Sequence, residues 1–449
     1  MNDFSSRFRC TIIRGKSQNI IEDLIPIYCE IIKSNDGVSN HEFIISFNEK
    51  IKRFLPDSID KTFDNHRTEI SHKLYGLYYI DEYDNVRISK RASDFIESGD
   101  LTALFKSLVD LFQQPNGMES LKKINEKIDA GISFKPYHFI VSLLKIAKEK
   151  NILILKNDIS YYILDTLFVL QGKISPEEVL NKIIIDRNEN IKNKISYQGK
   201  SSSYCYQHTN EQINILELSG VINVNDNVVS LSDSEGDFIN HLINQSYSEL
   251  NFNFKFDNLD NLDNLDKIGI CWDFYYNSDR TLSMMEDKAK HQNKPEISPY
   301  KQTSIDIGDE GEDIIYNHEY NRIKEFNRRL VNKIIKQGKQ RGLGYDIASI
   351  WGINDNGLEP DAPFYIEVKT TKRITKPKNI KFDKFNLTRN EWLSADTHGD
   401  NYAIYRLYIT RDGNYLYKIF HPLNYKEAFC VPINYNYEFN VKKDMELLN

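Results

Sequence analysis

The chain has 449 residues, a formal net charge of −7 and 40% hydrophobic residues. This length exceeds what one hydrophobic core usually supports, and the composition excludes a disordered chain, so we expect two or three domains. No apolar stretch reaches the roughly 18 residues that a membrane helix needs, so no membrane association is predicted. The five cysteines form no CxxC pair, which argues against a zinc knuckle or a disulfide framework and favours the reducing cytoplasm.

Two stretches of the N-terminal half, 74–96 and 218–239, resemble each other. Each predicts the end of a helix, a glycine, a short strand, a turn at an Asp-Asn pair, a second strand and a serine-capped helix. A helix followed by such a hairpin is typical of the winged helix-turn-helix, whose recognition helix enters the major groove of DNA. The alternative is a winged-helix unit that makes only protein contacts.

These patterns predict a multidomain α+β protein with mostly helical winged-helix units in its N-terminal half. The clear units are 1–100 and 196–256, and the region between them, 101–195, is predicted to be helical and winged-helix-like. A low-complexity Asp-Asn-Leu repeat lies in 257–303, which is the predicted linker. The remaining 304–449 is predicted to be a separate domain.

The helix before each hairpin is the expected recognition element for double-stranded DNA. Asn65 and Arg67 precede the first hairpin, and Asn210 and Gln212 precede the second. Arg, Asn and Gln can each make paired hydrogen bonds to base edges. These four side chains are therefore the candidate base-reading residues.

Acidic residues and one lysine recur on three elements predicted in the last third. Glu312 lies in the first turn of a helix, and Asp346 lies at the start of a strand. The next strand carries Glu367 and Lys369 on one face, which we expect to be opposite its buried face. Glu319, on the same helix as Glu312, is expected at the surface edge. The predicted helix and strands cover 308–339, 345–351 and 364–371.

This combination suits hydrolysis of a phosphodiester. Two carboxylates, Asp346 and Glu367, can hold Mg²⁺, a hard cation that prefers oxygen ligands. The metal would lower the pKa of a bound water and offset negative charge in the transition state. Lys369 would orient or deprotonate that water. The alternative is an exposed Glu/Lys pair on an edge strand.

Five ordered motifs resemble the PD-(D/E)xK nuclease superfamily and, within it, the NO VEIN C-terminal domain. The resemblance covers about 308–420 and implies an α/β restriction-endonuclease-like core. It implies that Asp346, Glu367 and Lys369 are catalytic, and that Asp346, Glu367 and Glu312 hold the metal. Thr370 stands where the family usually has glycine. The motifs are Gly311-Glu312, Gly344-Tyr345-Asp346-Ile347, Ile366-Glu367-Val368-Lys369-Thr370, Leu387-Thr388-Arg389-Asn390-Glu391 and the strand 402–408.

A basic stretch follows the candidate catalytic strand. Lys372, Arg373, Lys376 and Lys378 lie within 322–384, which holds fifteen Lys or Arg and seven Asp or Glu. We expect these four side chains to contact DNA phosphates, because phosphate contacts supply most of the affinity for DNA. The alternative is a solvated loop.

The layout is similar to that of type IIS restriction endonucleases, which join winged-helix recognition units to such a nuclease. We therefore expect a sequence-specific, Mg²⁺-dependent DNA endonuclease of the prokaryotic cytosol that leaves 5′-phosphate ends. A transient homodimer on DNA and a cognate methyltransferase are the expected partners. The alternatives are a modification-dependent or nonspecific anti-phage nuclease, and a non-catalytic winged-helix regulator.

Overall fold

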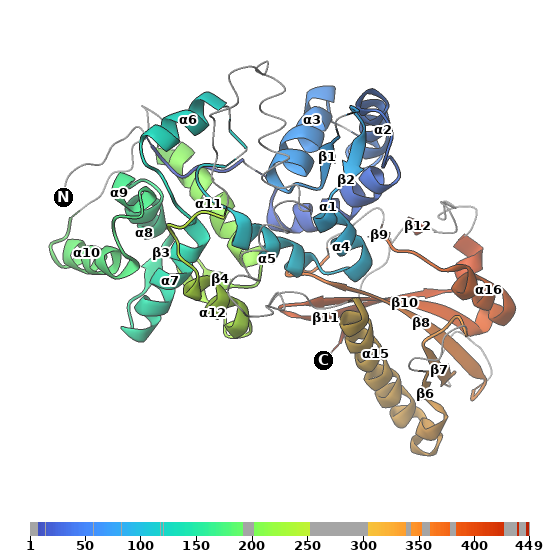
Figure 1. The fold of residues 1–449 in the computed structure, drawn as a ribbon. Helices are drawn as coiled ribbons and strands as arrows, with labels where there is room; N and C mark the ends of the chain where they lie inside the picture. The colour runs from blue at the N-terminus through green and yellow to red at the C-terminus, as the bar shows by residue number, and fades with distance from the viewer. Residues whose placement is uncertain are drawn as a thin grey trace, which may run out of the picture. The chain divides into compact units, whose positions relative to one another are not determined.

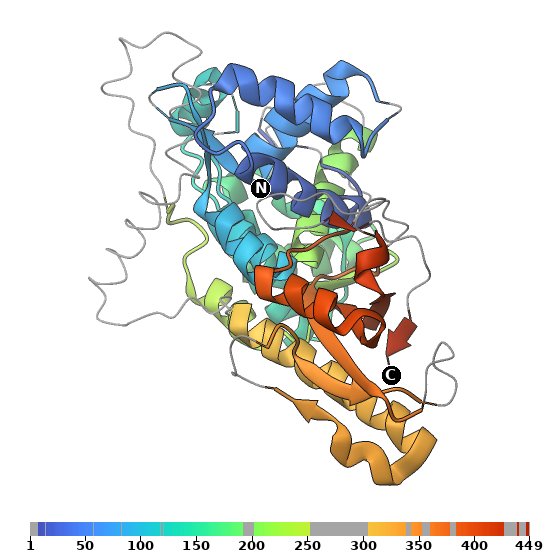
Figure 2. The same cartoon turned by 90° about the vertical axis from the view of Figure 1, so that its right-hand side faces the viewer.

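The computed structural model divides by its internal contacts into two compact units. The first comprises 1–21, 28–96 and 102–301, and the second comprises 22–27, 97–101 and 302–449. Figures 1 and 2 draw the helices and strands. The residues described are 8–13, 15–56, 58–81, 83–116, 118–119, 121–191, 202–251, 304–337, 343–352, 360–377, 383–425, 438–439 and 446–448.

The N-terminal half is built mainly from helices (Figure 1). They are α1 (Gln18–Lys33), α2 (Asn40–Lys52), α3 (Asp60–Asp64), η1 (Asn65–Leu74), α4 (Lys90–Ser98), α5 (Leu101–Leu111), α6 (Leu121–Asp129), α7 (Pro136–Glu149), α8 (Lys156–Asp158), η2 (Ile159–Ile163), α9 (Leu167–Leu170), α10 (Pro176–Asn188), α11 (Ser202–Leu218) and α12 (Gly236–Asn244).

Both copies of the sequence repeat form a helix, a β-hairpin and a second helix, as predicted. Gly76 and Gly220 have φ angles of 58° and 77°, which glycine adopts without steric cost. Asp84 and Asp226, at the hairpin turns, also have positive φ, which Asp tolerates better than most residues. The hairpins are antiparallel pairs of β1 (Tyr78–Ile80) with β2 (Val86–Ile88) and of β4 (Ile222–Asn225) with β5 (Val228–Leu231).

The second hairpin gains a third strand from the preceding region. The two-residue strand β3 (Ile154–Leu155) pairs with β5, which gives the order β3-β5-β4. The ranges 101–195 and 196–256, which the sequence predicted as separate units, thus share one sheet. A strand of two residues is too short to produce the alternating pattern by which strands are recognised.

The second unit contains a six-stranded sheet in the order β13-β11-β10-β8-β7-β6. Strands β10 and β8 are parallel, and the other neighbouring pairs are antiparallel. The elements are α15 (Ser304–Asn327), η3 (Arg328–Lys333), β6 (Ile335–Lys336), β7 (Ile347–Ile350), β8 (Pro363–Lys372), β9 (Asp383–Lys384), α16 (Arg389–His398), η4 (Gly399–Asn401), β10 (Tyr402–Thr410), β11 (Gly413–Phe420), η5 (Pro422–Tyr425), β12 (Glu438–Phe439) and β13 (Glu446–Leu448).

The prediction of one helix over 308–339 is wrong at its C-terminal end. The α-helix ends at Asn327, whose side chain accepts a hydrogen bond from the backbone N–H of Arg329 (3.0 Å). A 3₁₀ turn follows, and Ile335 then pairs with Ala348 of β7. Helical spacing of apolar residues continues past Asn327, but a side chain that competes for backbone hydrogen bonds favours a helix end.

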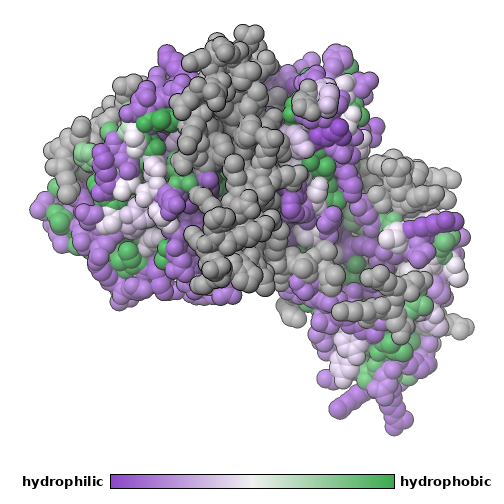
Figure 3. All heavy atoms as spheres, in the orientation of Figure 1, coloured by the Kyte–Doolittle hydropathy of each residue, from purple (hydrophilic) through white to green (hydrophobic). Residues whose placement is uncertain are grey.

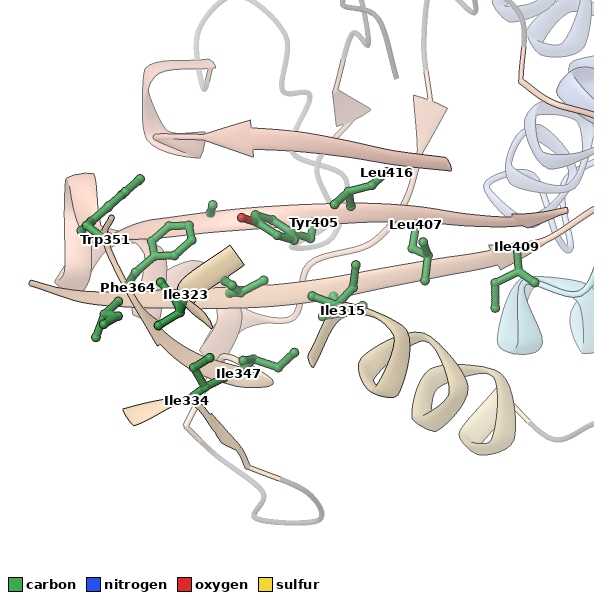
Figure 4. Close-up of a cluster of buried hydrophobic side chains, with 14 residues drawn as sticks. Ile315, Ile323, Ile334, Ile347, Trp351, Phe364, Tyr405, Leu407, Ile409 and Leu416 are labelled. Atoms are coloured by element: carbon green, nitrogen blue, oxygen red, sulfur yellow. The ribbon is translucent and has the colours of Figure 1, made fainter. Parts of the chain in front are cut away.

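The central strands are buried on both faces. One face carries the main hydrophobic cluster, which includes Ile315 of α15, Ile366, Tyr405 and Leu407 (Figure 4). The other face carries a second cluster, which includes Leu387, Ala395 and Ile404. The expectation that Glu367 lies on an open face of its strand is therefore wrong, since only 3% of this residue is exposed. Parallel strands inside a sheet are usually covered on both faces.

No described helix is long and apolar enough to cross a membrane. Among the residues coloured in Figure 3, hydrophilic ones predominate, and hydrophobic ones gather in separate patches.

Helix α15 packs closely against β8 at one glycine. A Cβ atom added at Gly311 would lie 1.9 Å from the Thr370 Oγ1 atom. We expect Gly311→Ala to lower the free energy of unfolding by about 1–3 kcal/mol, the usual cost of overpacking, although alanine favours helix. Denaturant unfolding measures this loss. In a Thr370→Gly background the same substitution should cost little, and an equal cost in both backgrounds would contradict this contact.

Candidate functional site

Asp346 is held in place by the neighbouring strand. Its backbone N–H donates to the Ile366 carbonyl (2.9 Å), and its carboxylate accepts a hydrogen bond from the Val368 N–H (2.7 Å). Gly344, two residues earlier, has a φ of 74°, and a Cβ there would lie 2.4 Å from the Asn390 carbonyl of α16. Only glycine fits both constraints, so this residue lets the chain pass beneath α16 and present Asp346 to β8.

Lys369 lies between two carboxylates. Its Nζ atom donates to Glu367 Oε1 (2.6 Å) and forms an ion pair with Glu391 Oε2 (2.8 Å). Glu367 precedes it on β8, whereas Glu391 lies in the first turn of α16. The two elements are thus joined through one ammonium group.

Glu312 comes to this site from α15. Its neighbour Gly311 is the residue that contacts Thr370, next to Lys369 on β8. Lys336 Nζ lies 3.5 Å from Glu312 Oε2 and 2.7 Å from Asp313 Oδ1. The structure therefore brings the four predicted residues Glu312, Asp346, Glu367 and Lys369 to one region.

The carboxyl groups of this site are short of positive charge. Burial and, to a smaller extent, the negative charge of Asp346 raise the pKa of Glu312 to about 7. Burial also raises the pKa of Asp346, and it raises that of Glu367 well above its usual value. Burial opposes the charge on Lys369, but Glu367 and Glu391 outweigh it, so the pKa of Lys369 is raised. Clusters of raised carboxyl pKa values are typical of functional sites.

The donor set suits a hard cation. Carboxylate oxygens are the ligands that Mg²⁺ prefers, and a bound cation would supply the positive charge that Asp346 and Glu367 lack. Among the described residues, no three His, Cys, Asp or Glu side chains are already arranged around a common metal position. The ammonium of Lys369, 2.6 Å from Glu367, would have to give up part of this contact to a metal.

Glu319 is not at the surface edge of its helix, as the sequence predicted. It is fully buried, pairs with Arg322 (2.6 Å) and accepts hydrogen bonds from Ser349 (2.7 Å) and Tyr405 (3.1 Å). Burial alone would raise its pKa, but Arg322 and the hydrogen bonds outweigh burial and lower it. Glu319 is thus a fully partnered structural acid.

The basic residues after β8 differ in their surroundings. Arg373 is 3% exposed and pairs with Asp23 (2.6 Å), so its guanidinium is not free to bind phosphate. Lys372 is half-buried, whereas Lys376 is exposed and lies 4.8 Å from the ring centre of Tyr415. Lys378 lies outside the described residues.

The candidate base-reading residues also divide into two kinds. Asn65 and Asn210 are exposed. Arg67 is buried and pairs with Asp64 (3.0 Å), and Gln212 is fully buried and donates to the Cys10 carbonyl (2.8 Å). Helical spacing turns Gln212 toward the core of the first unit, which leaves Asn65 and Asn210 as the accessible candidates.

The sequence alone assigned no catalytic or binding role to Glu391. It forms a capping box with Thr388, because its carboxylate accepts from the Thr388 N–H (2.9 Å) and its own N–H donates to Thr388 Oγ1 (3.3 Å). A Thr-x-x-Glu pattern predicts a helix start, but not that the same carboxylate also contacts Lys369.

The raised pKa of Glu312 predicts a pH-dependent cost. The folded chain keeps this proton up to about pH 7, while the unfolded chain loses it near pH 4.5, so the free energy of unfolding falls across this window as pH rises. We expect Glu312→Gln to raise the free energy of unfolding at pH 8, without divalent ions, by about 2 kcal/mol.

Calorimetry of the variant at pH 8 and pH 4 measures this effect. The gain should disappear at pH 4, where the Glu312 carboxyl is protonated in both states. Glu325→Gln, at an exposed position of the same helix, is the control and should show no such gain. An equal effect of Glu312→Gln at both pH values would contradict the assignment.

Comparison with known proteins gives matches for both halves. The family model described as "Restriction endonuclease BpuJI - N terminal" matches residues 3–272, and that described as "Protein NO VEIN, C-terminal" matches residues 311–419. The second match confirms the resemblance of the sequence motifs to the NO VEIN C-terminal domain. No curated protein matches the chain.

One similar solved structure is a crystal structure of pyrene- and phenanthrene-modified DNA in complex with the BpuJ1 endonuclease binding domain. It is 38% identical, with a TM-score of 0.58, and the match covers 62% of this chain and all of that domain. The first family model matches more than half of the sequence. The chain therefore belongs to the restriction endonuclease family that is described by the N-terminal part of BpuJI.

Proposed function

We propose that the chain is a sequence-specific DNA endonuclease of the PD-(D/E)xK type that uses Mg²⁺ and leaves 5′-phosphate ends. The observation that carries this proposal is the meeting of Asp346, Glu367 and Lys369 across β7 and β8. Glu312 joins them from α15. The family match of the N-terminal half supports DNA cleavage as the activity that these residues serve.

Asp346 and Glu367 would hold the ion, and Glu312 would complete its surroundings from α15. Mg²⁺ bound there would supply a water of lowered pKa and positive charge for the transition state. The backbone of β8 fixes Asp346 through the Val368 N–H. This arrangement keeps the carboxylate oriented before substrate arrives, and such preorganisation lowers the barrier.

Lys369 acts as a cation in this mechanism. Its raised pKa keeps the ammonium protonated at neutral pH, so it can donate a hydrogen bond to the scissile phosphate or to the attacking water. It would not abstract a proton in this state. Of the two roles that the sequence left open, orienting the attacking water fits better than deprotonating it.

The first unit is the proposed DNA-recognition part. The similar domain of known structure was solved with DNA, and the two helix-hairpin-helix units here have the order of elements of winged helices. Asn65 and Asn210, exposed on the helices before the hairpins, would read base edges. Lys376, which lies in the second unit, would contact a phosphate of the DNA backbone.

Lys369→Ala tests the catalytic assignment. We expect at least a roughly hundredfold loss of plasmid cleavage in Mg²⁺, the scale seen when a group that stabilises charge in the transition state is removed. Lys324→Ala, an exposed lysine of α15, should cut as fast as the wild type. EDTA should abolish cleavage by the wild type, and undiminished cleavage by Lys369→Ala would refute the assignment.

Digestion of methylated and unmethylated plasmid separates the proposal from its main alternative. Discrete fragments from unmodified DNA support a restriction enzyme with a cognate methyltransferase. Cleavage of modified DNA alone supports a modification-dependent defence nuclease. Run-off sequencing of the ends would also show whether both strands are cut, as expected if two chains act as a transient homodimer on DNA. Sedimentation that shows one copy bound during double-strand cutting would refute the homodimer.

Asn210→Ala tests recognition by the first unit. A side chain that reads a base should contribute about 1–3 kcal/mol to specific binding, so the affinity for the cognate site should fall while nonspecific affinity stays the same. Binding titrations at fixed salt measure both. Asn188→Ala, at an exposed position of α10, is the matched control, and equal behaviour of the two variants would count against Asn210.

A further inference from the structure

Glu391 contacts Lys369, but neither the sequence nor the proposed mechanism gives this acid a task. It is half-buried at the start of α16, and its Oε2 atom receives hydrogen bonds from two sources. The Thr388 N–H donates to it at 2.9 Å, and Lys369 Nζ lies 2.8 Å away. The capping box fixes the carboxylate relative to the helix, so Glu391 offers Lys369 a rigid partner.

The second partner of Lys369 is itself a proposed metal ligand. Glu367 Oε1 accepts from Lys369 Nζ at 2.6 Å, so the ammonium and a divalent ion compete for one carboxylate. If Glu367 were the only partner of Lys369, its turning toward a metal would leave the ammonium unpaired, which is strongly unfavourable for a charge shielded from water. With Glu391 present, Lys369 keeps a partner when Glu367 turns toward the metal.

We infer that Glu391 is a positioning residue that retains Lys369 while Glu367 binds the metal. This inference rests on the proposed function, and it assigns to α16 a part in forming the metal site. Glu391 would act on the ion through Lys369 and not by contact with it. Loss of its charge should therefore weaken metal binding as long as Lys369 is present.

Two substitutions separate this role from helix capping. Glu391→Gln keeps an oxygen that accepts from the Thr388 N–H, because glutamine also forms capping boxes, but it removes the charge that holds Lys369. Thr388→Ala removes the hydroxyl that caps the helix and leaves the Glu391 carboxylate. The first variant loses the ion pair, and the second loses the cap.

Mn²⁺ binding by the full chain, followed by the paramagnetic resonance signal of free Mn²⁺, gives a readout that does not require cleavage. We expect Glu391→Gln to weaken Mn²⁺ binding about tenfold or more, as substitutions beside metal ligands commonly do. Thr388→Ala should bind as the wild type does. In a Lys369→Met background, Glu391→Gln should have little further effect.

Each other outcome has a definite meaning. Equal weakening by Glu391→Gln with and without Lys369 would show a direct effect of charge on the ion and overturn the inference. Weakening by Thr388→Ala to the same extent would assign the effect to the helix cap. Unchanged binding by Glu391→Gln would overturn the inference while the proposed function stands, whereas a wild type that binds no Mn²⁺ would remove the metal site and the inference together.

Discussion

The contact of Lys369 with Glu367 and Glu391 is the interaction on which the candidate site of the second unit depends. An ammonium that is largely shielded from water is stable only when it is paired and hydrogen-bonded, and the two partners of Lys369 come from a strand and from a helix. Close packing at two glycines brings the elements of this site together. Gly344 lets the chain pass beneath α16, and Gly311 lets α15 approach β8 at Thr370.

Two groups of acids in this unit have opposite electrostatic surroundings. Glu319 has Arg322, Ser349 and Tyr405 as partners, and its pKa is lowered. Glu367 and Asp346 share one nearby ammonium, and their pKa values are raised. Carboxylates that lie together without enough nearby positive charge lower the stability of the folded chain. Such a group is expected where a cation or a substrate uses it. This contrast supports a metal-dependent reaction at the second group.

In the first unit, the accessibility of side chains decides which residues could read DNA. In the helices that precede its two hairpins, some polar residues are engaged in the interior, as Gln212 and Arg67 are. These two side chains are therefore not available to read DNA bases. Specific recognition would depend on exposed residues such as Asn65 and Asn210 and on contacts of the hairpins with the DNA backbone.

The sequence by itself determined the local features: the two hairpins with their glycines and Asp turns, the strand that bears Glu367 and Lys369, and the helix start at Thr388. Each depends on residues close in the chain, so spacing and turn chemistry suffice. Only the tertiary structure decided that β3 joins β5, that Glu367 and Glu319 are buried, that Arg373 is engaged by Asp23, and that Glu391 reaches Lys369. These features join residues far apart in sequence, where burial and partner choice depend on how the elements pack and leave no local pattern.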